Sequence, residues 1–245
     1  MRRFKISALS PTYFQISGEE FYHLTKVLRL QEGEQVIGFD NSGRQWLGII
    51  SELSRDTAYC QIIKEETPSV EAGTSVYLVM GLAKGEKMEW VIQKGTELGM
   101  KGFVPLRAQR SVLQLEGKKA EDRVRRWQRI ATEAVKQSRR TIEPRVERIV
   151  GWSELKGLFP TQTQWLLAYE EEKTKPFKKA LPNLNYKDPI AILIGPEGGF
   201  APEEVTLARQ MLGAESVSLG PRILRAETAA LASLTMVLFY HGDLG

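Results

Sequence analysis

Residues 190–200 read IAILIGPEGGF, a run of five apolar residues that continues directly into a turn rich in glycine. A continuous apolar run of this length predicts a strand that is buried on both faces, as in parallel sheets. In α/β sheets ligands bind outside the carboxyl ends of the strands, so the turn from Gly195 to Gly199 is a candidate binding loop. An ordinary tight turn between a strand and a helix is the alternative at this point.

A second glycine turn, residues 220–229, reads GPRILRAETA and leads from a predicted strand into a predicted final helix. Glu227 and Thr228 suit the first turn of that helix. Helix capping does not explain why Arg222 and Arg225 lie three residues apart in the same loop. The final helix is apolar nearly all round, which indicates burial in the core or in a subunit interface.

The turn after residue 194 differs from the common nucleotide-binding loops. It has neither the spacing Gly-x-x-x-x-Gly-Lys-Ser/Thr nor the spacing Gly-x-Gly-x-x-Gly. Glu197 lies inside the turn, where its carboxylate would repel a pyrophosphate and attract a cation. S-adenosylmethionine carries a sulfonium and an ammonium group and no phosphate, so this turn suits it better than NAD or ATP.

The composition limits the classes of protein to which the chain can belong. Of its 245 residues 42% are hydrophobic and 26% charged, close to globular averages, which argues against wholesale disorder. The single cysteine, Cys60, excludes an internal disulfide, and two histidines are too few for a cysteine–histidine metal cluster, so no metal is expected. The longest apolar stretch, residues 229–240, is too short to span a bilayer, and we see no signal peptide, so we expect a soluble cytoplasmic protein.

The pattern of predicted strands and helices changes near residue 73. Short strands punctuated by Asn, Asp and Gly predict a small barrel or meander in residues 1–72, interrupted by a helix at 18–28. Strands alternate with helices in residues 73–245, which predicts an α/β domain with a mostly parallel sheet and helices on both faces. The predicted strands are 35–39, 45–50, 58–63, 76–82, 102–106, 165–169, 190–194 and 216–219. The predicted helices of the second part are 87–98, 121–138, 202–212 and 227–241.

Positive charge is concentrated in one part of the chain. Residues 118–148 carry eleven Lys and Arg against five Asp and Glu, an excess larger than the net charge of +4 for the whole chain. Arg139 and Arg140 directly follow the predicted helix in this run, and Arg2 and Arg3 begin a smaller basic cluster. Such a patch gives salt-dependent affinity for a phosphate backbone, and its concentration here favours nucleic acid over a merely solvated helix face.

Four segments together resemble the RsmE family of SPOUT-class methyltransferases, which act on N3 of a uridine in 16S ribosomal RNA. They are GEKMEWVIQKGTELG at 85–99, EAVKQSR at 133–139, LIGPEGGF at 193–200 and LGPRILRAETA at 219–229. The resemblance covers essentially the whole chain, and four motifs in the right order are far more specific than any one of them. One departure is Arg139, which stands where many relatives have a small residue.

The resemblance implies a fold, partners and a set of site residues. Residues 1–72 would form a PUA-like RNA-binding β-barrel, and residues 73–245 a SPOUT domain with a C-terminal trefoil knot, active as a homodimer with the last helix at the interface. S-adenosylmethionine would bind in the knot loops, on Ala168, Tyr169, Glu170, Ile194, Gly195, Pro196, Glu197, Gly198, Leu219, Gly220, Ile223, Leu224, Arg225, Thr228 and Ala229. The 16S RNA of the small ribosomal subunit would contact Arg2, Arg3, Lys94, Arg123, Arg126, Gln137, Arg139 and Arg140.

Methyl transfer to uracil N3 requires the loss of a proton, so we expect catalytic roles for Arg225, Glu197 and Glu227. Arg225 would supply positive charge near the developing anion, and one of the two glutamates would orient the cofactor or act as base. A non-catalytic ribosome- or RNA-binding module is the alternative, but it gives no reason for two glycine–proline turns after successive strands. A nicotinamide oxidoreductase is disfavoured by the missing dinucleotide motif.

Overall fold

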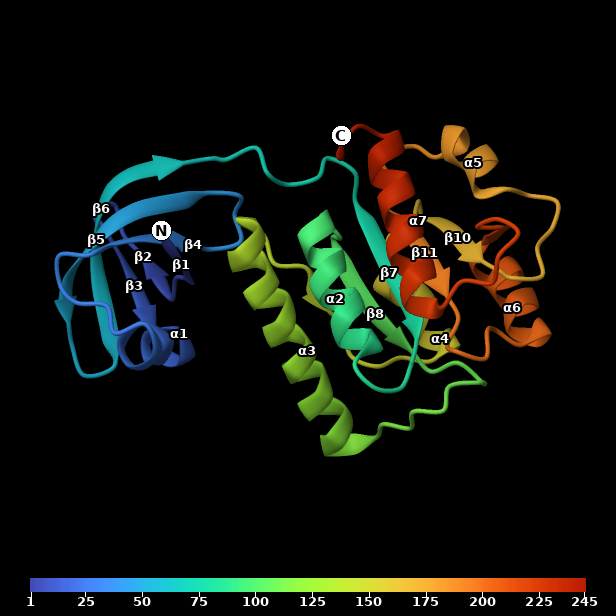
Figure 1. Ribbon diagram of the computed structural model, residues 1–245, viewed down its shortest axis with the longest axis horizontal. Coiled ribbons are helices and arrows are strands. Elements are labelled where there is room, and N and C mark those ends of the chain that lie inside the picture. The colour runs from blue at the N-terminus through green and yellow to red at the C-terminus, as the bar shows by residue number, and fades with distance from the viewer. The chain divides into compact units, whose positions relative to one another are not determined.

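The computed structural model describes residues 1–245, and the apolar run at 190–194 forms an inner strand of a parallel sheet (Figure 1). The sheet has the strand order β12-β10-β11-β7-β8-β9, and every pairing in it is parallel. Its strands are β7 (Val76–Gly81), β8 (Gly102–Leu106), β9 (Arg145–Val146), β10 (Gln164–Ala168), β11 (Ile190–Ile194) and β12 (Glu215–Val217). The predicted parallel sheet is confirmed, because helical crossovers return each strand in the same direction.

Helices cover both faces of this sheet. Ile190, Ile192 and Ile194 face one core cluster, and Ala191 and Leu193 face the other. The first cluster includes residues of α2 (Lys87–Leu98), α3 (Gly117–Ser138), α5 (Phe177–Ala180) and α7 (Ala226–Tyr240), and the second includes residues of α4 (Trp152–Leu155) and α6 (Pro202–Leu212). Two short 3₁₀ segments are η2 (Lys156–Leu158) and η3 (Leu181–Asn183). No helix combines the length and apolarity that a bilayer span requires.

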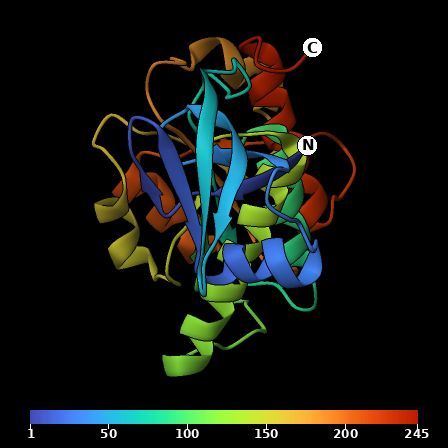
Figure 2. The same ribbon diagram turned by 90° about the vertical axis from the view of Figure 1, so that its left-hand side faces the viewer.

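A second sheet of six strands is built from the N-terminal residues (Figure 2). Its order is β1-β4-β5-β6-β3-β2, and all its pairings are antiparallel except that of β1 with β4. The strands are β1 (Arg2–Lys5), β2 (Ala8–Leu9), β3 (Tyr13–Ser17), β4 (Gln35–Phe39), β5 (Gln45–Leu53) and β6 (Thr57–Glu66), and the helical segments are α1 (Gly18–Tyr22) and η1 (His23–Val27). The sheet curls, because β1 and β2 are neighbours in the chain yet lie at opposite ends of this order. The curled sheet encloses its own core around Phe4, Phe14 and Trp46.

The chain divides into two compact units that are not contiguous in sequence. Unit 1 comprises Met1–Glu71 and Val135–Glu143, and unit 2 comprises Ala72–Ala134 and Pro144–Gly245. Helix α3 therefore contributes its last four residues to unit 1 and the rest to unit 2.

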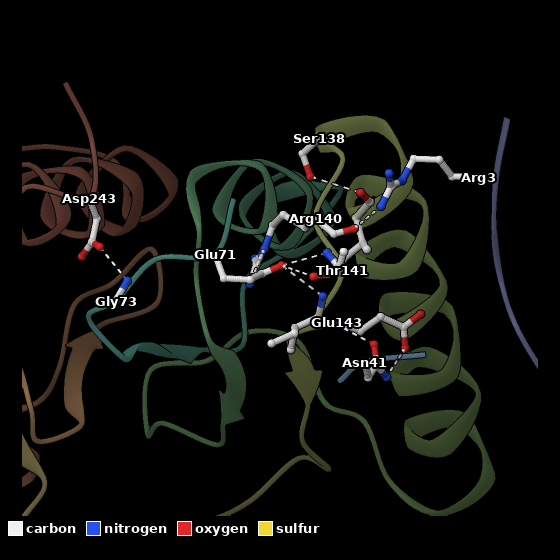
Figure 3. A network of polar contacts seen from close by, with 11 residues as sticks. Arg3, Asn41, Glu71, Gly73, Ser138, Arg140, Thr141, Glu143 and Asp243 are labelled. Carbon is white, nitrogen blue, oxygen red and sulfur yellow. Dashed lines mark hydrogen bonds and ion pairs between the residues drawn. The ribbon is translucent and has the colours of Figure 1, made fainter. Parts of the chain in front are cut away.

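The carboxylate of Glu71 joins the two segments of unit 1 (Figure 3). It accepts hydrogen bonds from Arg140 Nε and Nη2, at 2.9 and 2.8 Å, and from the Thr141 and Ile142 N–H groups, at 2.8 and 3.0 Å. Burial raises the pKa of Glu71, but the charge of Arg140 and these hydrogen bonds outweigh it, so the pKa lies below its ordinary value. In unit 2, the Asp243 carboxylate accepts a hydrogen bond from the Gly73 N–H at 2.6 Å in a similar way (Figure 3).

We expect Glu71→Gln to lower the free energy of unfolding at neutral pH by about 3 kcal/mol, because Arg140 stays buried without its carboxylate partner. Glu71 stabilises the fold only while it is ionised, and its pKa is lower in the folded chain than in the unfolded chain. The stabilisation is therefore present above about pH 4.5 and is lost as the pH falls through the lower, folded value. Urea unfolding followed by circular dichroism between about pH 3 and pH 7 measures both effects.

Glu52→Gln is the matched control, since Glu52 is an exposed glutamate on β5 of the same unit. Its expected effect is within about 0.5 kcal/mol at every pH. An equal cost of Glu71→Gln in acid and at neutral pH would contradict the proposed ion pair.

Candidate active site

A cavity of about 950 Å³ opens in unit 2 at the carboxyl ends of β10 and β11 and just beyond β12. Three segments supply most of its lining, within residues 168–176, 194–199 and 218–229. Lys87, at the start of α2, adds to the wall. The carboxyl ends of parallel strands are the usual place for a ligand in such sheets, so this cavity is the candidate active site.

The cavity brings together most of the residues that the sequence predicted for the cofactor and for catalysis. Those that line it are Ala168, Tyr169, Glu170, Ile194, Gly195, Pro196, Glu197, Gly198, Leu219, Gly220, Ile223, Leu224, Arg225, Glu227 and Ala229. Thr228 does not line it and is exposed on the first turn of α7. The prediction omitted Lys87, Glu172, Lys173, Pro176, Gly199, Ser218, Pro221, Arg222 and Ala226, which also line the wall. All of these except Lys87 lie in the same three loops. Including every residue of each predicted loop would therefore have identified them.

Gly195 and Gly199 in the turn after β11, and Gly81 at the end of β7, have no room for a side chain. A Cβ atom at Gly195 would lie 2.9 Å from the carbonyl carbon of Gly199, and one at Gly81 would lie 2.5 Å from Pro196 Cδ. Gly199 has φ of +66° and a Cβ there would collide with the carboxylate of Glu170. The glycines therefore let two backbone segments meet directly at the wall of the cavity.

A buried glutamate that the sequence analysis missed holds this turn in place. Glu204 is 6% exposed, and it accepts hydrogen bonds from the Ala201 and Gln109 N–H groups, at 2.9 and 2.8 Å, and from Trp152 Nε1, at 2.9 Å. The bond to Ala201 caps the start of α6, three residues earlier in the chain. The position of Glu204, three residues after the residue that precedes α6, is typical of a helix cap and could have predicted this role. The carboxylate ties the end of the glycine turn to the chain that follows β8.

Glu197 is already occupied by partners within the protein. Its Oε1 accepts hydrogen bonds from the Lys84 N–H at 2.9 Å and from Lys87 Nζ at 2.8 Å. Burial raises its pKa, but the bonds from Lys87 and from backbone N–H groups outweigh this, and the pKa lies below its ordinary value. A carboxylate with a lowered pKa is a weaker base, and this one fastens the segment before α2 to the glycine turn.

Five charged side chains of the cavity have no hydrogen bond or ion pair within the chain: Glu170, Glu227, Lys173, Arg222 and Arg225. The Oε2 atom of Glu227 is buried without any hydrogen-bond partner. Buried polar atoms normally have partners, so an orphaned acceptor in a cavity wall indicates a ligand or substrate group. Since both signs of charge are present, the cavity can bind a ligand that carries both.

The basic residues predicted to contact RNA on the long helices have carboxylate partners. Lys94 Nζ lies 2.9 Å from Glu97 Oε1 on α2. Arg123 and Arg126 of α3 both pair with Glu89 of α2, at 3.1 and 2.8 Å. Arg123 and Arg126 therefore stabilise the contact of α2 with α3, whereas Lys94 pairs within α2. Each of these three cations is only partly available to a phosphate.

The remaining predicted RNA contacts belong to unit 1 and fall into two groups. Arg140 is 3% exposed and forms an ion pair with Glu71. Its guanidinium is therefore not available to a phosphate. Arg3, Gln137 and Arg139 line one cavity, and Arg2 is exposed on β1.

The chain is similar to proteins that act on RNA. A family model described as RNA methyltransferase domain matches residues 70–238, and one described as RNA methyltransferase PUA domain matches residues 16–63. The ribosomal RNA small subunit methyltransferase E of Bacillus subtilis is 37% identical over 234 residues, which cover 94% of this chain and 91% of that protein. The protein of the same name from Synechocystis is 33% identical over 219 residues, covering 89% and 70%.

Solved structures are similar over almost the whole chain. One is the ribosomal RNA small subunit methyltransferase E from Neisseria gonorrhoeae bound to S-adenosyl methionine. It has a TM-score of 0.84 and 30% sequence identity, and the match covers 96% of each chain.

Proposed function

Because the chain belongs to the ribosomal RNA small subunit methyltransferase E family, we propose that it methylates N3 of a uridine in 16S ribosomal RNA with S-adenosylmethionine as donor. The observation that carries the proposal is the cavity at the carboxyl ends of β10 and β11, with unpartnered charges of both signs. Methylation of ribosomal RNA follows from the family, whereas the uridine and its N3 atom rest on the sequence motifs.

The residues of the cavity fit S-adenosylmethionine. Glu170 is acidic and unpaired, which complements the positive charge of this molecule. Ile194, Leu219 and Ala229 provide apolar surface for the adenine ring. When bound, the cofactor supplies a methyl group that is already activated on a sulfonium.

The chain's own residues prepare the uracil for methylation. Glu227 accepts the N3 proton, since its Oε2 atom is buried in the wall without a hydrogen-bond partner. Arg225 places positive charge beside O2 or O4, where the negative charge of the deprotonated ring is spread. Glu197, which is held by Lys84 and Lys87, positions the loops instead of moving a proton.

The same proposal covers the domains and the assembly. Residues 1–72 bind RNA as a PUA-like barrel, and residues 73–245 transfer the methyl group. The return of the chain after β11 to pair β12 with the far side of β10 supports a trefoil knot around the cavity. Exposed apolar side chains on α7, Phe239 at 67% and Tyr240 at 48%, support a homodimer through this helix.

Two experiments test the proposed function. Calorimetric titration measures the affinity for S-adenosylmethionine, and mass mapping of 16S RNA locates the added methyl group. We expect the purified protein to bind the cofactor and to add one methyl group to a uridine in small subunits from a strain that lacks the gene. Affinity for RNA without affinity for the cofactor or its demethylated product would instead identify a non-catalytic RNA-binding module.

A further inference from the structure

Unit 1 contains a second cavity, of about 530 Å³, and no residue that lines it also lines the active-site cavity. We call it the unit 1 pocket. It is lined by Met1, Arg3, Ile37, Gln45, Pro68, Val70, Lys136, Gln137 and Arg139. All these residues belong to unit 1, and none of them is acidic.

Two cations of the unit 1 pocket have no carboxylate partner. Arg3 donates only to neutral acceptors. Its Nη1 donates to Gln45 Oε1 at 2.7 Å, and its Nη2 donates to the carbonyl oxygen of Arg140 at 3.0 Å, the second of which is drawn in Figure 3. Its Nε atom is buried and has no partner. Arg139 is exposed and makes no ion pair. Burial lowers the pKa of Arg3, and the positive charge of Arg139 lowers it further, so the two guanidinium groups repel each other.

Lys136 of the pocket and three other cations of unit 1 are paired with carboxylates of the same unit. Lys136 Nζ lies 2.5 Å from Glu20, and Lys5 Nζ lies 2.6 Å from Glu143. Arg140 pairs with Glu71 at 2.8 Å, and Lys64 pairs with Glu66 at 2.8 Å. The positive charge of Arg3 and Arg139 is therefore left for an anion from outside the chain.

The backbone at Arg139 also indicates a role beyond folding. Its φ is +64°, in the left-handed region where a side chain other than glycine is strained. A glycine would relieve this strain, yet an arginine with no internal partner occupies the position. Strain of this kind is retained at sites where the side chain has a use.

Apart from Arg3, Arg139 and Lys136, which is paired with Glu20, the side chains that line the unit 1 pocket are apolar or neutral. Ile37, Pro68 and Val70 form apolar surface, and Val70 is 42% exposed. Gln137 is exposed and adds an amide that can donate or accept. A group with a phosphate and a flat apolar ring with polar edges matches this combination, which is the chemistry of an unpaired nucleotide.

We propose that the unit 1 pocket binds one unpaired nucleotide of the RNA substrate, with its phosphate on Arg3 and Arg139 and its base against Ile37, Pro68 and Val70. The inference rests on the proposed function, because it assigns a separate anchoring point to the same RNA. It differs from the active site in that no reacting atom lies in the unit 1 pocket.

Arg139→Gly tests the proposal without adding strain, since glycine suits the left-handed backbone at this position. The probe is an oligouridylate of about ten nucleotides, whose affinity is measured by fluorescence anisotropy at several salt concentrations. We expect roughly tenfold weaker binding and a salt slope smaller by about 0.7, the value for one lost phosphate contact on a single strand. With 16S RNA as substrate, KM for the RNA rises and kcat stays unchanged.

Arg55→Ala is the matched control, because Arg55 is an exposed arginine of unit 1 in the turn after β5 and does not line the pocket. It keeps the affinity and salt slope of the unaltered protein. An Arg139→Gly protein with an unchanged slope, beside an unaltered protein that binds RNA, overturns the inference. An unaltered protein that neither binds nor methylates RNA contradicts the proposed function instead.

Replacing single phosphates of the oligonucleotide with neutral methylphosphonates tests whether one phosphate is recognised. One position is expected to weaken binding to the unaltered protein and to have no further effect on Arg139→Gly. If the two losses add at every position, Arg139 does not contact a particular phosphate, and the unit 1 pocket is not a nucleotide site.

Discussion

Arg225→Ala is expected to lower kcat for RNA methylation by about 10²–10³-fold, the usual effect of removing one preorganised group from a developing anion. Arg225 lines the active-site cavity and has no partner in the chain, so its charge is available to the substrate. The affinity for S-adenosylmethionine changes little, because the substitution removes a charge that stabilises the uracil anion and not the bound cofactor. Single-turnover methylation with saturating RNA and cofactor measures the effect.

The pH profile separates this role from a structural one. Without the arginine the uracil holds its N3 proton more tightly, so the rate of Arg225→Ala continues to rise to higher pH than that of the unaltered enzyme. Arg225→Lys restores part of the rate, and Lys187→Ala, an exposed cation outside the cavity, changes neither rate nor profile. Full activity of Arg225→Ala would show that this arginine has no part in catalysis.

Gly195→Ala is expected to weaken binding of S-adenosylmethionine by about 100-fold or more, because even one methyl group forces the glycine turn open. The added Cβ would lie 2.9–3.0 Å from backbone atoms of Gly199 and Phe200, and backbone cannot move aside as a flexible side chain can. Overpacking of this kind costs about 1–3 kcal/mol, which lowers the melting temperature by several degrees and leaves the chain folded. Calorimetric titration with S-adenosylhomocysteine measures the affinity.

Gly157→Ala is the control, since a Cβ at this position of unit 2 meets no atom within 4 Å. It keeps the affinity and the melting temperature. A Gly195→Ala protein that binds the cofactor normally would mean that the turn is loose enough to adapt.

The parallel sheet was predictable because its signals are local. The strands at 102–106 and 190–194 and the helices at 87–98 and 202–212 are observed with the predicted bounds. The strands at the N-terminus were missed for the opposite reason. β1, β2 and β3 have four, two and five residues, and β1 and β3 are defined by pairing with β4 and β6, which lie 34 and at least 40 residues further along the chain. Such short runs carry too few alternations to be distinguished from loops.

The active-site loops were predictable because glycine and proline mark the ends of β11 and β12. What the sequence could not give is the partner of each charge. Glu89 binds two arginines that follow it by 34 and 37 residues, so nothing in the local pattern indicates that they are paired. Glu197 was proposed for the cofactor or the proton, whereas the fold brings Lys87 to it from 110 residues earlier.

The division of α3 between the units affects how this protein can be taken apart. A fragment that ends near residue 71 lacks residues 135–143 and with them every hydrogen-bond donor to the Glu71 carboxylate. A single cleavage between Glu71 and Ala72 leaves the N-terminal product without residues 135–143 of unit 1, and the C-terminal product carries them instead. A chimera that exchanges the N-terminal part with a relative must therefore carry the end of α3 as well. Insertions and deletions in this protein should therefore be tolerated in surface loops and selected against at the boundary between Glu71 and Ala72 and at residues 135–143 alike.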